Sequence, residues 1–148
     1  MKVAEIWRYP VKSMAGERLE RARVTPLGIE GDRVVHAEDA QGRVITARTH
    51  PRLLGHRAML NPSGEPLVDG VPWTDPDTRR HVVNAVGPGA RLARNETGTA
   101  FDVLPLLVAT DGAIAAFGHD GRRLRPNLLI SGVEGMAERS WPGHRLRI

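Results

Sequence analysis

Short apolar runs separated by turn residues are the feature that most limits what this 148-residue chain can fold into. Its 16 glycines and 11 prolines are spread along the sequence and interrupt segments that are rich in β-branched residues. Glycine and proline favour turns, whereas β-branched residues favour strands. The pattern therefore predicts a mainly β chain, built as a β-barrel-like or sandwich fold with one or two short helices.

Two hairpins are the clearest local predictions. Strands at 33–37 and 43–47 flank a polar turn that ends in a glycine. A second pair, at 56–60 and 66–68, surrounds the turn sequence Asn-Pro-Ser-Gly. Both segments have the short turn and the β-rich flanks that are typical of hairpins. A further strand is predicted at the start of the chain, where an alternating apolar pattern ends at Pro10.

The second half of the chain predicts a different local order. The apolar run Leu104–Thr110 predicts a buried strand, and Asp111–Phe117 predicts a short helix that Asp111 caps and Gly118 ends. Residues 126–132 predict another strand, and 144–148 a strand fragment.

One region and one boundary are less defined by the sequence. Residues 75–86 are compatible with either a helix or a strand. Residues 87–98 are rich in glycine and predict a loop-rich boundary, or seam, between two parts of the chain.

Composition limits the kind of protein. The net charge is +4, and 19 of the 21 cationic residues are arginines, which suits an anionic partner. The arginines are dispersed and only six residues are aromatic, so nucleic-acid binding is not expected. The sequence shows no membrane-spanning run or signal peptide, and we expect a cytoplasmic protein. It contains no cysteine, so these 148 residues provide neither disulfides nor thiolate ligands.

Two polar clusters occur in the first third of the chain. In "YPVKS", Pro10 stiffens the segment that carries Lys12 and Ser13, and a lysine ammonium beside a serine hydroxyl suits a phosphate. In "GIEGDRVV", Arg33 stands next to Asp32 at the predicted mouth of a strand, where its guanidinium could bind an anion. A solvated turn and an exposed Asp–Arg pair are the respective structural alternatives.

Two more clusters lie further along. In "TARTHPRL", Arg48 could reach the same pocket as Arg33, whereas His50 and His56, six residues apart, match no compact metal motif. In "RRLRPNLLISG", alternation would place Arg125 and Asn127 on one side of a strand, where they could bind a planar polar group and a phosphate. The alternative is a basic loop that leads into a buried strand.

Taken together and in this order, these clusters resemble the MOSC family. The segments "RYPVKSMAGE", "GIEGDRVV", "ITARTHPRLL", "LRPNLLISG" and "SWPGHRLRI" are similar to molybdenum cofactor sulfurase C-terminal domains that carry an N-terminal β-barrel extension. The mitochondrial amidoxime-reducing component belongs to that family. The resemblance implies an N-terminal-like β region at 1–95 and a MOSC core-like region at 96–148, shortened relative to the family.

The resemblance also implies a cofactor site. Its members hold the molybdenum cofactor (molybdopterin), a pterin with a phosphate tail, in a positively charged cleft. Seven positions match the residues that hold it: Lys12, Ser13, Arg33, Arg48, Thr110, Arg125 and Asn127. The family's cysteine ligand would follow Ile148, so no residue of this sequence takes its place.

The sequence is compatible with three functions. The chain could be an oxidoreductase or sulfur carrier that uses the molybdenum cofactor. It could be a module that binds a small anionic cofactor or substrate without catalysis, and pyridoxal phosphate is not excluded as such a cofactor. It could also be an enzyme of different chemistry, with Lys12, Asp32, His36 or His119 as acid–base groups. A homodimer would cover the sheet edge that a shortened barrel exposes.

Overall fold

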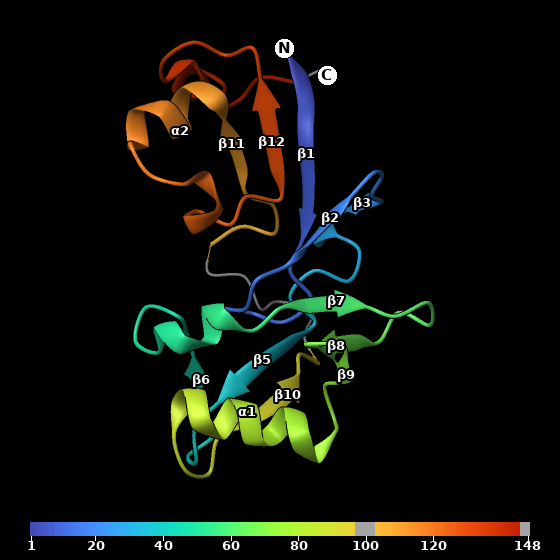
Figure 1. Cartoon of the computed structure of the whole chain (residues 1–148). Coiled ribbons are helices and arrows are strands. Elements are labelled where there is room, and N and C mark those ends of the chain that lie inside the picture. Colours follow the sequence, from blue (N-terminus) through green and yellow to red (C-terminus); the bar gives the residue numbers. More distant parts are fainter. Residues whose placement is uncertain (97–102, 146–148) are drawn as a thin grey trace.

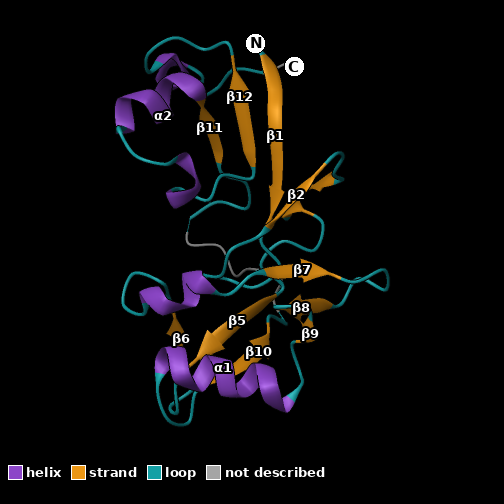
Figure 2. Cartoon of the chain, viewed as in Figure 1, coloured by secondary structure: helices purple, strands orange, loops and turns teal. Residues whose placement is uncertain are grey.

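The chain forms an upper and a lower lobe that meet near its middle (Figure 1). The computed structural model describes residues 1–96 and 103–145. The upper lobe contains a four-stranded sheet with a short helix beside it, and the lower lobe contains two three-stranded sheets and a longer helix (Figure 2). The prediction of a mainly β chain is confirmed. Within the described residues, however, the strands form separate sheets and none of these closes into a barrel.

The upper sheet joins the two ends of the described chain. Its strands, in spatial order, are β11 (Val108–Thr110), β12 (Leu128–Ser131), β1 (Lys2–Arg8) and β2 (Glu17–Leu19). Strand β1 is antiparallel to both of its neighbours, whereas β11 and β12 are parallel. The predicted strands at the start of the chain and at 126–132 are therefore confirmed, and they pair with each other.

Helix α2 (Asp111–Phe117) connects the two parallel strands, and its N-cap differs from the prediction. The hydroxyl Oγ1 of Thr110 caps the helix by accepting the Ala113 N–H at 2.9 Å. The Asp111 carboxylate instead accepts the backbone N–H groups of Gly132 and Val133, at 2.7 and 3.0 Å. Gly118 ends the helix as predicted, with a φ of 70° that suits glycine.

The first half of the predicted strand Leu104–Thr110 is wrong, because strand structure begins only at Val108. Leu104 is 70% exposed and Leu107 44% exposed, so this part of the apolar run is not buried. Pro105 lies between them and cannot donate to a sheet ladder, which accounts for the late start of the strand.

The lower lobe contains the first predicted hairpin. Its strands β5 (Val35–Glu38) and β6 (Val44–Ile45) pair antiparallel. Strand β10 (Arg91–Arg94) pairs with the other edge of β5, so the middle of the predicted seam is a strand of this sheet. The second predicted hairpin is also confirmed, as β7 (Ala58–Leu60) and β8 (Pro66–Val68).

The remaining strands are short. Strand β9 (Val71–Pro72) extends the β7–β8 sheet, and β3 (Val24–Thr25) pairs with β4 (Gly28–Ile29) in a hairpin of its own. Of the predicted strand at 144–148, residues 144 and 145 are not in a strand, and residues 146–148 lie outside the described residues.

Helix α1 (Pro76–Val86) resolves the ambiguous region 75–86 as helical. Asp75 provides the N-cap by accepting the Asp77 N–H at 2.8 Å, and Pro76 occupies the first turn, where no N–H donor is needed. Three 3-10 helices complete the described chain: η1 (Pro51–Gly55), η2 (Gly121–Arg123) and η3 (Ala137–Ser140). No helix in the described parts has the length and apolar character that crossing a bilayer requires.

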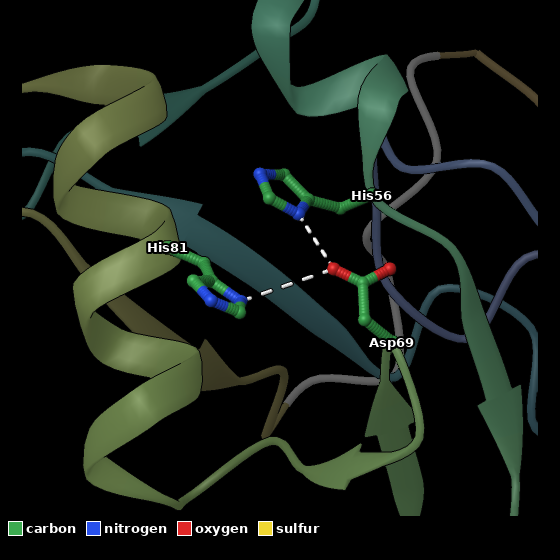
Figure 3. A group of neighbouring side chains, drawn as sticks. All are labelled: His56, Asp69 and His81. Carbon is green, nitrogen blue, oxygen red and sulfur yellow. Dashed lines mark hydrogen bonds and ion pairs between the residues drawn. The ribbon is translucent and has the colours of Figure 1, made fainter.

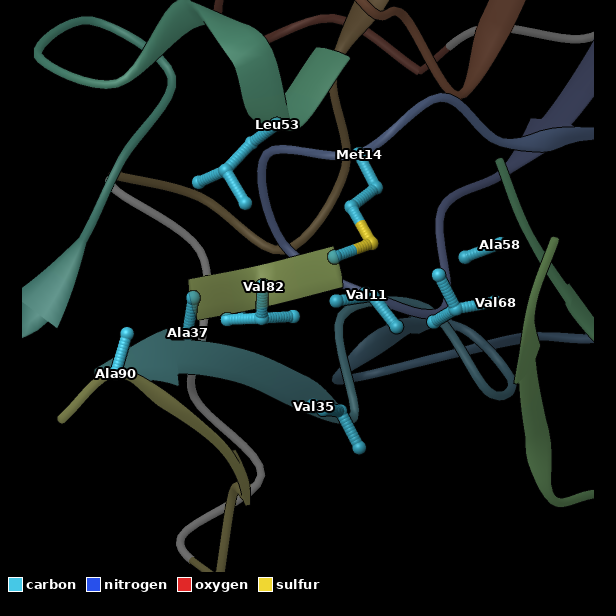
Figure 4. Packing of buried hydrophobic residues seen from close by; sticks show 9 residues of the cluster. All are labelled: Val11, Met14, Val35, Ala37, Leu53, Ala58, Val68, Val82 and Ala90. Carbon is cyan, nitrogen blue, oxygen red and sulfur yellow. The ribbon is translucent and has the colours of Figure 1, made fainter. Parts of the chain in front are cut away.

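The hydrophobic core of the lower lobe lies between α1, β5 and the segment that follows β1 (Figure 4). Its nine buried members are Val11, Met14, Val35, Ala37, Leu53, Ala58, Val68, Val82 and Ala90. Val11 and Met14 come directly after β1, so the chain that leaves the upper sheet forms part of the lower core. This packing places Lys12 and Ser13 next to the start of β5.

Candidate anion-binding site

Tyr9 lies where the two lobes meet and contacts three separate segments. Its ring is buried, and its hydroxyl donates to the carbonyl oxygen of Pro126 at 3.1 Å. Its backbone N–H donates to Oδ1 of Asp32 at 2.7 Å. Only glycine fits at position 16, since a Cβ there would lie 2.2 Å from the Arg8 carbonyl oxygen and 2.6 Å from Cδ1 of Tyr9. The tyrosine is therefore held in one orientation.

Two arginines stack on this one ring. The Cζ atoms of Arg33 and Arg125 lie 5.3 and 5.1 Å from the centre of the Tyr9 ring. Both distances are within the range of a cation–π contact. Arg33 and Arg125 are 92 residues apart in the sequence, and the fold brings their positive charges to the same aromatic group. We call Tyr9, Asp32, Arg33, Arg125 and Asn127 the Tyr9 site.

The Arg33 guanidinium uses only one of its three nitrogens in hydrogen bonds to described residues. Its Nη1 contacts Oδ2 of Asp32 and donates to Oδ1 of Asn127 at 3.3 Å. Across residues 1–96 and 103–145, every hydrogen bond of this side chain uses Nη1. The Nε and Nη2 donors remain for a ligand, while the 14% exposed side chain stays fixed by Asp32.

Asn127 joins the lobes through its amide. The side chain is fully buried, and its Oδ1 also accepts the Leu107 N–H at 3.1 Å. Its Nδ2 donates to the carbonyl oxygen of Trp7 at 3.3 Å. The amide thus orients Arg33 and connects β1 to the segment before β11.

Burial changes the acid–base behaviour of this site. It raises the pKa of Tyr9 from 10.0 to about 12, although Arg125 and Arg33 oppose the shift. Burial also raises the pKa of the Asp32 carboxyl above its usual value, against the lowering effect of the Arg33 guanidinium and of the hydrogen bond from Tyr9. At neutral pH the phenol is therefore uncharged.

Three of the predicted site residues have a left-handed backbone. Ser13, Arg33 and Arg125 have φ angles of 70°, 51° and 53°. Residues other than glycine rarely adopt this conformation, and the strain it stores is often found at functional sites.

Lys12, Ser13 and Arg48 lie near one another beside the lower lobe. The Lys12 N–H donates to the Val35 carbonyl oxygen at 2.8 Å, which places it along the start of β5. The buried hydroxyl of Ser13 accepts the Ala47 N–H at 2.9 Å, next to the exposed Arg48. The Ser13 hydroxyl thus holds the turn after β6.

Thr110 lies away from the Tyr9 site, as its distance from Asn127 shows. It pairs with Ile130 at the end of β11, whereas Asn127 precedes β12 by one residue. Ile130 is three residues after Asn127, so at the rise of a β-strand Thr110 and Asn127 are about 10 Å apart. The hydroxyl of Thr110 caps α2 and also donates to Oε2 of Glu138 at 3.1 Å.

Two hollows on the surface lie elsewhere. One of about 480 Å³ is formed by the β5–β6 turn and the end of α1, and one of about 570 Å³ lies along β1 and β2. None of the seven predicted site residues lines either hollow. The Tyr9 site is therefore defined by its contacts rather than by these hollows.

Sequence reasoning missed Tyr9, the centre of the site. Two signals were present: it is the only tyrosine of the chain, and it precedes Pro10 in the first polar cluster. Of the predicted acid–base candidates, Asp32 belongs to the Tyr9 site. The two histidines have other contacts: His36 lies 3.2 Å from Glu38, and His119 packs edge-on against Phe117.

A family model described as the MOSC N-terminal beta barrel domain matches residues 1–87. The matched range includes Lys12, Ser13, Arg33 and Arg48, and it ends before Arg125 and Asn127. No curated protein matches the chain.

Proposed function

The chain belongs to the family of the MOSC N-terminal beta barrel domain, and from that premise we propose that it binds an anionic, phosphate-bearing cofactor of the molybdopterin type at the Tyr9 site. MOSC proteins are generally related to the molybdenum cofactor. The proposal concerns the binding of this class of compound and assigns the contact to the guanidinium groups of Arg33 and Arg125.

One observation carries the proposal: two guanidinium groups lie on one buried tyrosine ring. The guanidinium groups of Arg33 and Arg125 carry like charges and repel each other in this partly desolvated site. The carboxyl group of Asp32 pairs with Arg33. An anion bound beside the arginines would be attracted by both guanidinium groups. Guanidinium groups also suit phosphate oxygens, because they offer several donors in one plane.

The donor set fits the phosphate arm of such a cofactor better than its metal. Guanidinium, ammonium and amide groups bind anionic oxygen. The Nε and Nη2 groups of Arg33, with three N–H bonds between them, donate to no residue of the described ranges. A thiolate ligand for molybdenum is not available from these 148 residues, since they contain no cysteine. The cofactor itself would supply oxygen-atom or N–O chemistry, and the role that we propose for these residues is to bind and orient its anionic end.

Lys12, three residues after Tyr9, is a third cationic group in addition to Arg33 and Arg125. It is half-buried, and its backbone N–H donates to the carbonyl oxygen of Val35 at the start of β5. A lysine ammonium is a compact point charge and a common phosphate partner. We propose that Lys12 adds charge to the site, whereas the hydroxyls of Ser13 and Thr110 serve the turn and the helix cap that they hold.

The test is a fluorescence titration of the full chain with a pterin that carries a phosphate monoester. We expect saturable binding, and a loss of affinity of about tenfold or more in Arg125→Ala, as for the removal of one charged hydrogen bond. Arg123→Ala is the matched control, because Arg123 is exposed and lies only two residues away. It should bind the phosphorylated pterin as the unaltered chain does.

Three results would contradict the proposal. The phosphate would have no role if the unphosphorylated pterin bound equally well. A general effect of positive charge would explain the data if Arg123→Ala weakened binding as much as Arg125→Ala. Pyridoxal phosphate provides a further arm: tighter binding than the phosphorylated pterin would reassign the cofactor class while keeping the anion site.

A further inference from the structure

A second cluster of chemically active side chains lies in the lower lobe, and it shares no residue with the Tyr9 site. His56 follows η1, Asp69 occupies the turn between β8 and β9, and His81 lies on α1 (Figure 3). The three side chains point toward one another from these three elements. Nδ1 of His56 lies 2.7 Å from Oδ2 of Asp69, and Nδ1 of His81 lies 3.9 Å from the same oxygen.

The carboxylate is held in place by the backbone. The N–H of Arg57 donates to Oδ1 of Asp69 at 2.8 Å, which leaves Oδ2 directed at the two histidines. The Asp69 N–H donates in turn to the Arg57 carbonyl oxygen at 2.8 Å. Asp69 also has a left-handed backbone, with a φ of 52°. Such a backbone hydrogen bond to the second oxygen is the support that ligating carboxylates usually have.

The two imidazole rings are already arranged side by side. Their centres are 5.6 Å apart, and their planes differ by 14°. One nitrogen of each ring and one carboxylate oxygen lie within 4.8 Å of one another. Ligands of a tetrahedral zinc ion with bonds of about 2.0–2.1 Å are about 3.4 Å apart, so small side-chain rotations would suffice.

The cluster is also accessible from solvent. The side chains of His56, Asp69 and His81 are 21%, 35% and 45% exposed. A metal ion could therefore enter, and water could occupy its remaining coordination positions. Two imidazoles and one carboxylate are a donor set that borderline divalent ions such as Zn²⁺ prefer, whereas Mg²⁺ and Ca²⁺ prefer oxygen.

We propose that His56, Asp69 and His81 form a binding site for one divalent transition-metal ion of the zinc class, completed by water. This site is distinct from the proposed cofactor site in its residues, its lobe and its ligand. A bound ion would also tie α1 to η1 and to the β8–β9 turn, and so would stabilise the lower lobe.

The experiment is a calorimetric titration of the full, chelator-treated chain with Zn²⁺ in a non-coordinating buffer. We expect one ion per chain and a higher melting temperature in its presence. His81→Ala should weaken binding by about 100-fold or more, because the loss of a direct ligand costs more than the 10–100-fold that the loss of an outer-shell partner costs. Co²⁺ offers a second readout, because its visible absorption reports nitrogen and oxygen ligation.

Two further variants make the test decisive. Asp69→Asn keeps the size of the side chain, and asparagine tolerates a left-handed backbone, so this variant should fold and yet bind Zn²⁺ much more weakly. His119→Ala is the control, since His119 is exposed and lies outside the cluster. No saturable binding of Zn²⁺ or Co²⁺ by the unaltered chain, or unchanged affinity in folded His81→Ala and Asp69→Asn, would overturn the proposal. The phosphorylated-pterin titration should be unaffected by these variants, so the two proposals can fail separately.

Discussion

Four residues other than glycine have a left-handed backbone in the described part of the chain, and three of them belong to a candidate site: Arg33, Arg125 and Asp69. Ser13, Arg33 and Arg125 were predicted site residues, and Asp69 holds the two histidines. A strained backbone costs of order 1 to 3 kcal/mol per residue and persists only where other contacts maintain it. Strain at Arg33, Arg125 and Asp69 is consistent with side chains that are positioned for ligands, whereas the Ser13 hydroxyl holds the turn after β6.

The titration of Tyr9 tests the environment of the Tyr9 site directly. Because Tyr9 is the only tyrosine, tyrosinate absorbance reports on this residue alone. We expect the folded chain to titrate with a pKa of about 12 and the unfolded chain near 10.0, because burial disfavours the phenolate. The folded state then binds the proton more tightly, so the free energy of unfolding should decrease as the pH rises from 10 to about 12.

Denaturation at several alkaline pH values measures this dependence. The control is Tyr9→Phe, which cannot ionise and should lack the part of the decrease that Tyr9 contributes. A folded-state pKa near 10.0 would contradict the buried position of the ring that Arg33 and Arg125 contact.

At the start of helix α2, the neighbouring residues Thr110 and Asp111 have different structural roles. Thr110 caps the helix, while Asp111 accepts two N–H groups from the segment that follows β12. These hydrogen bonds hold the pKa of the Asp111 carboxyl below its usual value. The N-terminus of helix α2 is thereby capped by Thr110 and joined through Asp111 to the residues that follow β12.

The cap can be separated from a role in cofactor binding. We expect Thr110→Ala to lower the free energy of unfolding by about 1 kcal/mol, and Thr110→Ser to restore most of it, because a serine hydroxyl also caps helices. The affinity for the phosphorylated pterin should stay unchanged in both variants. A folded Thr110→Ala variant that loses this affinity would instead support the cofactor role that the family resemblance implies for Thr110.

Local chemistry explains which elements the sequence could predict. The second hairpin depends on its own turn, where Oδ1 of Asn61 accepts the N–H groups of Ser63 and Glu65. The exchange of roles between Thr110 and Asp111 was not predictable, since it depends on Gly132, 21 residues away.

In the candidate sites, too, local features were predictable from the sequence and contacts between distant residues were not. Arg33, Arg125 and Asn127 were predictable as polar residues in recognisable clusters. Their meeting at Tyr9 was not, because the contact between Tyr9 and Pro126 spans 117 residues. Asp69 is 13 residues from His56 and 12 from His81, and each residue lies on a different element, so no motif spacing could join them.

At the scale of the molecule, the upper sheet joins residues that the predicted domain division would separate. Strand β1, which begins at Lys2, pairs with β12 through Lys2 and Ser131 at one end and Ile6 and Leu128 at the other. The hydroxyl of Tyr9 and the amide of Asn127 cross the same boundary. Regions 1–95 and 96–148 thus share one sheet and one set of buried hydrogen bonds.

These shared contacts predict that residues 1–95 and 96–148, expressed as two separate chains, associate with each other. Without β12, one edge of β1 has lost its hydrogen-bond partners, and the second chain supplies them. Co-purification through a tag on the first chain measures the association. Asn127→Ala in the second chain should reduce the recovered amount strongly, because it leaves the Leu107 N–H and the Trp7 carbonyl oxygen without this partner, at a cost of about 1 to 3 kcal/mol for each group. Arg139→Ala, an exposed change in η3, should have no effect. If residues 1–95 alone kept the melting temperature of the full chain, the two regions would be independent domains, and the shared sheet would contribute little to the fold.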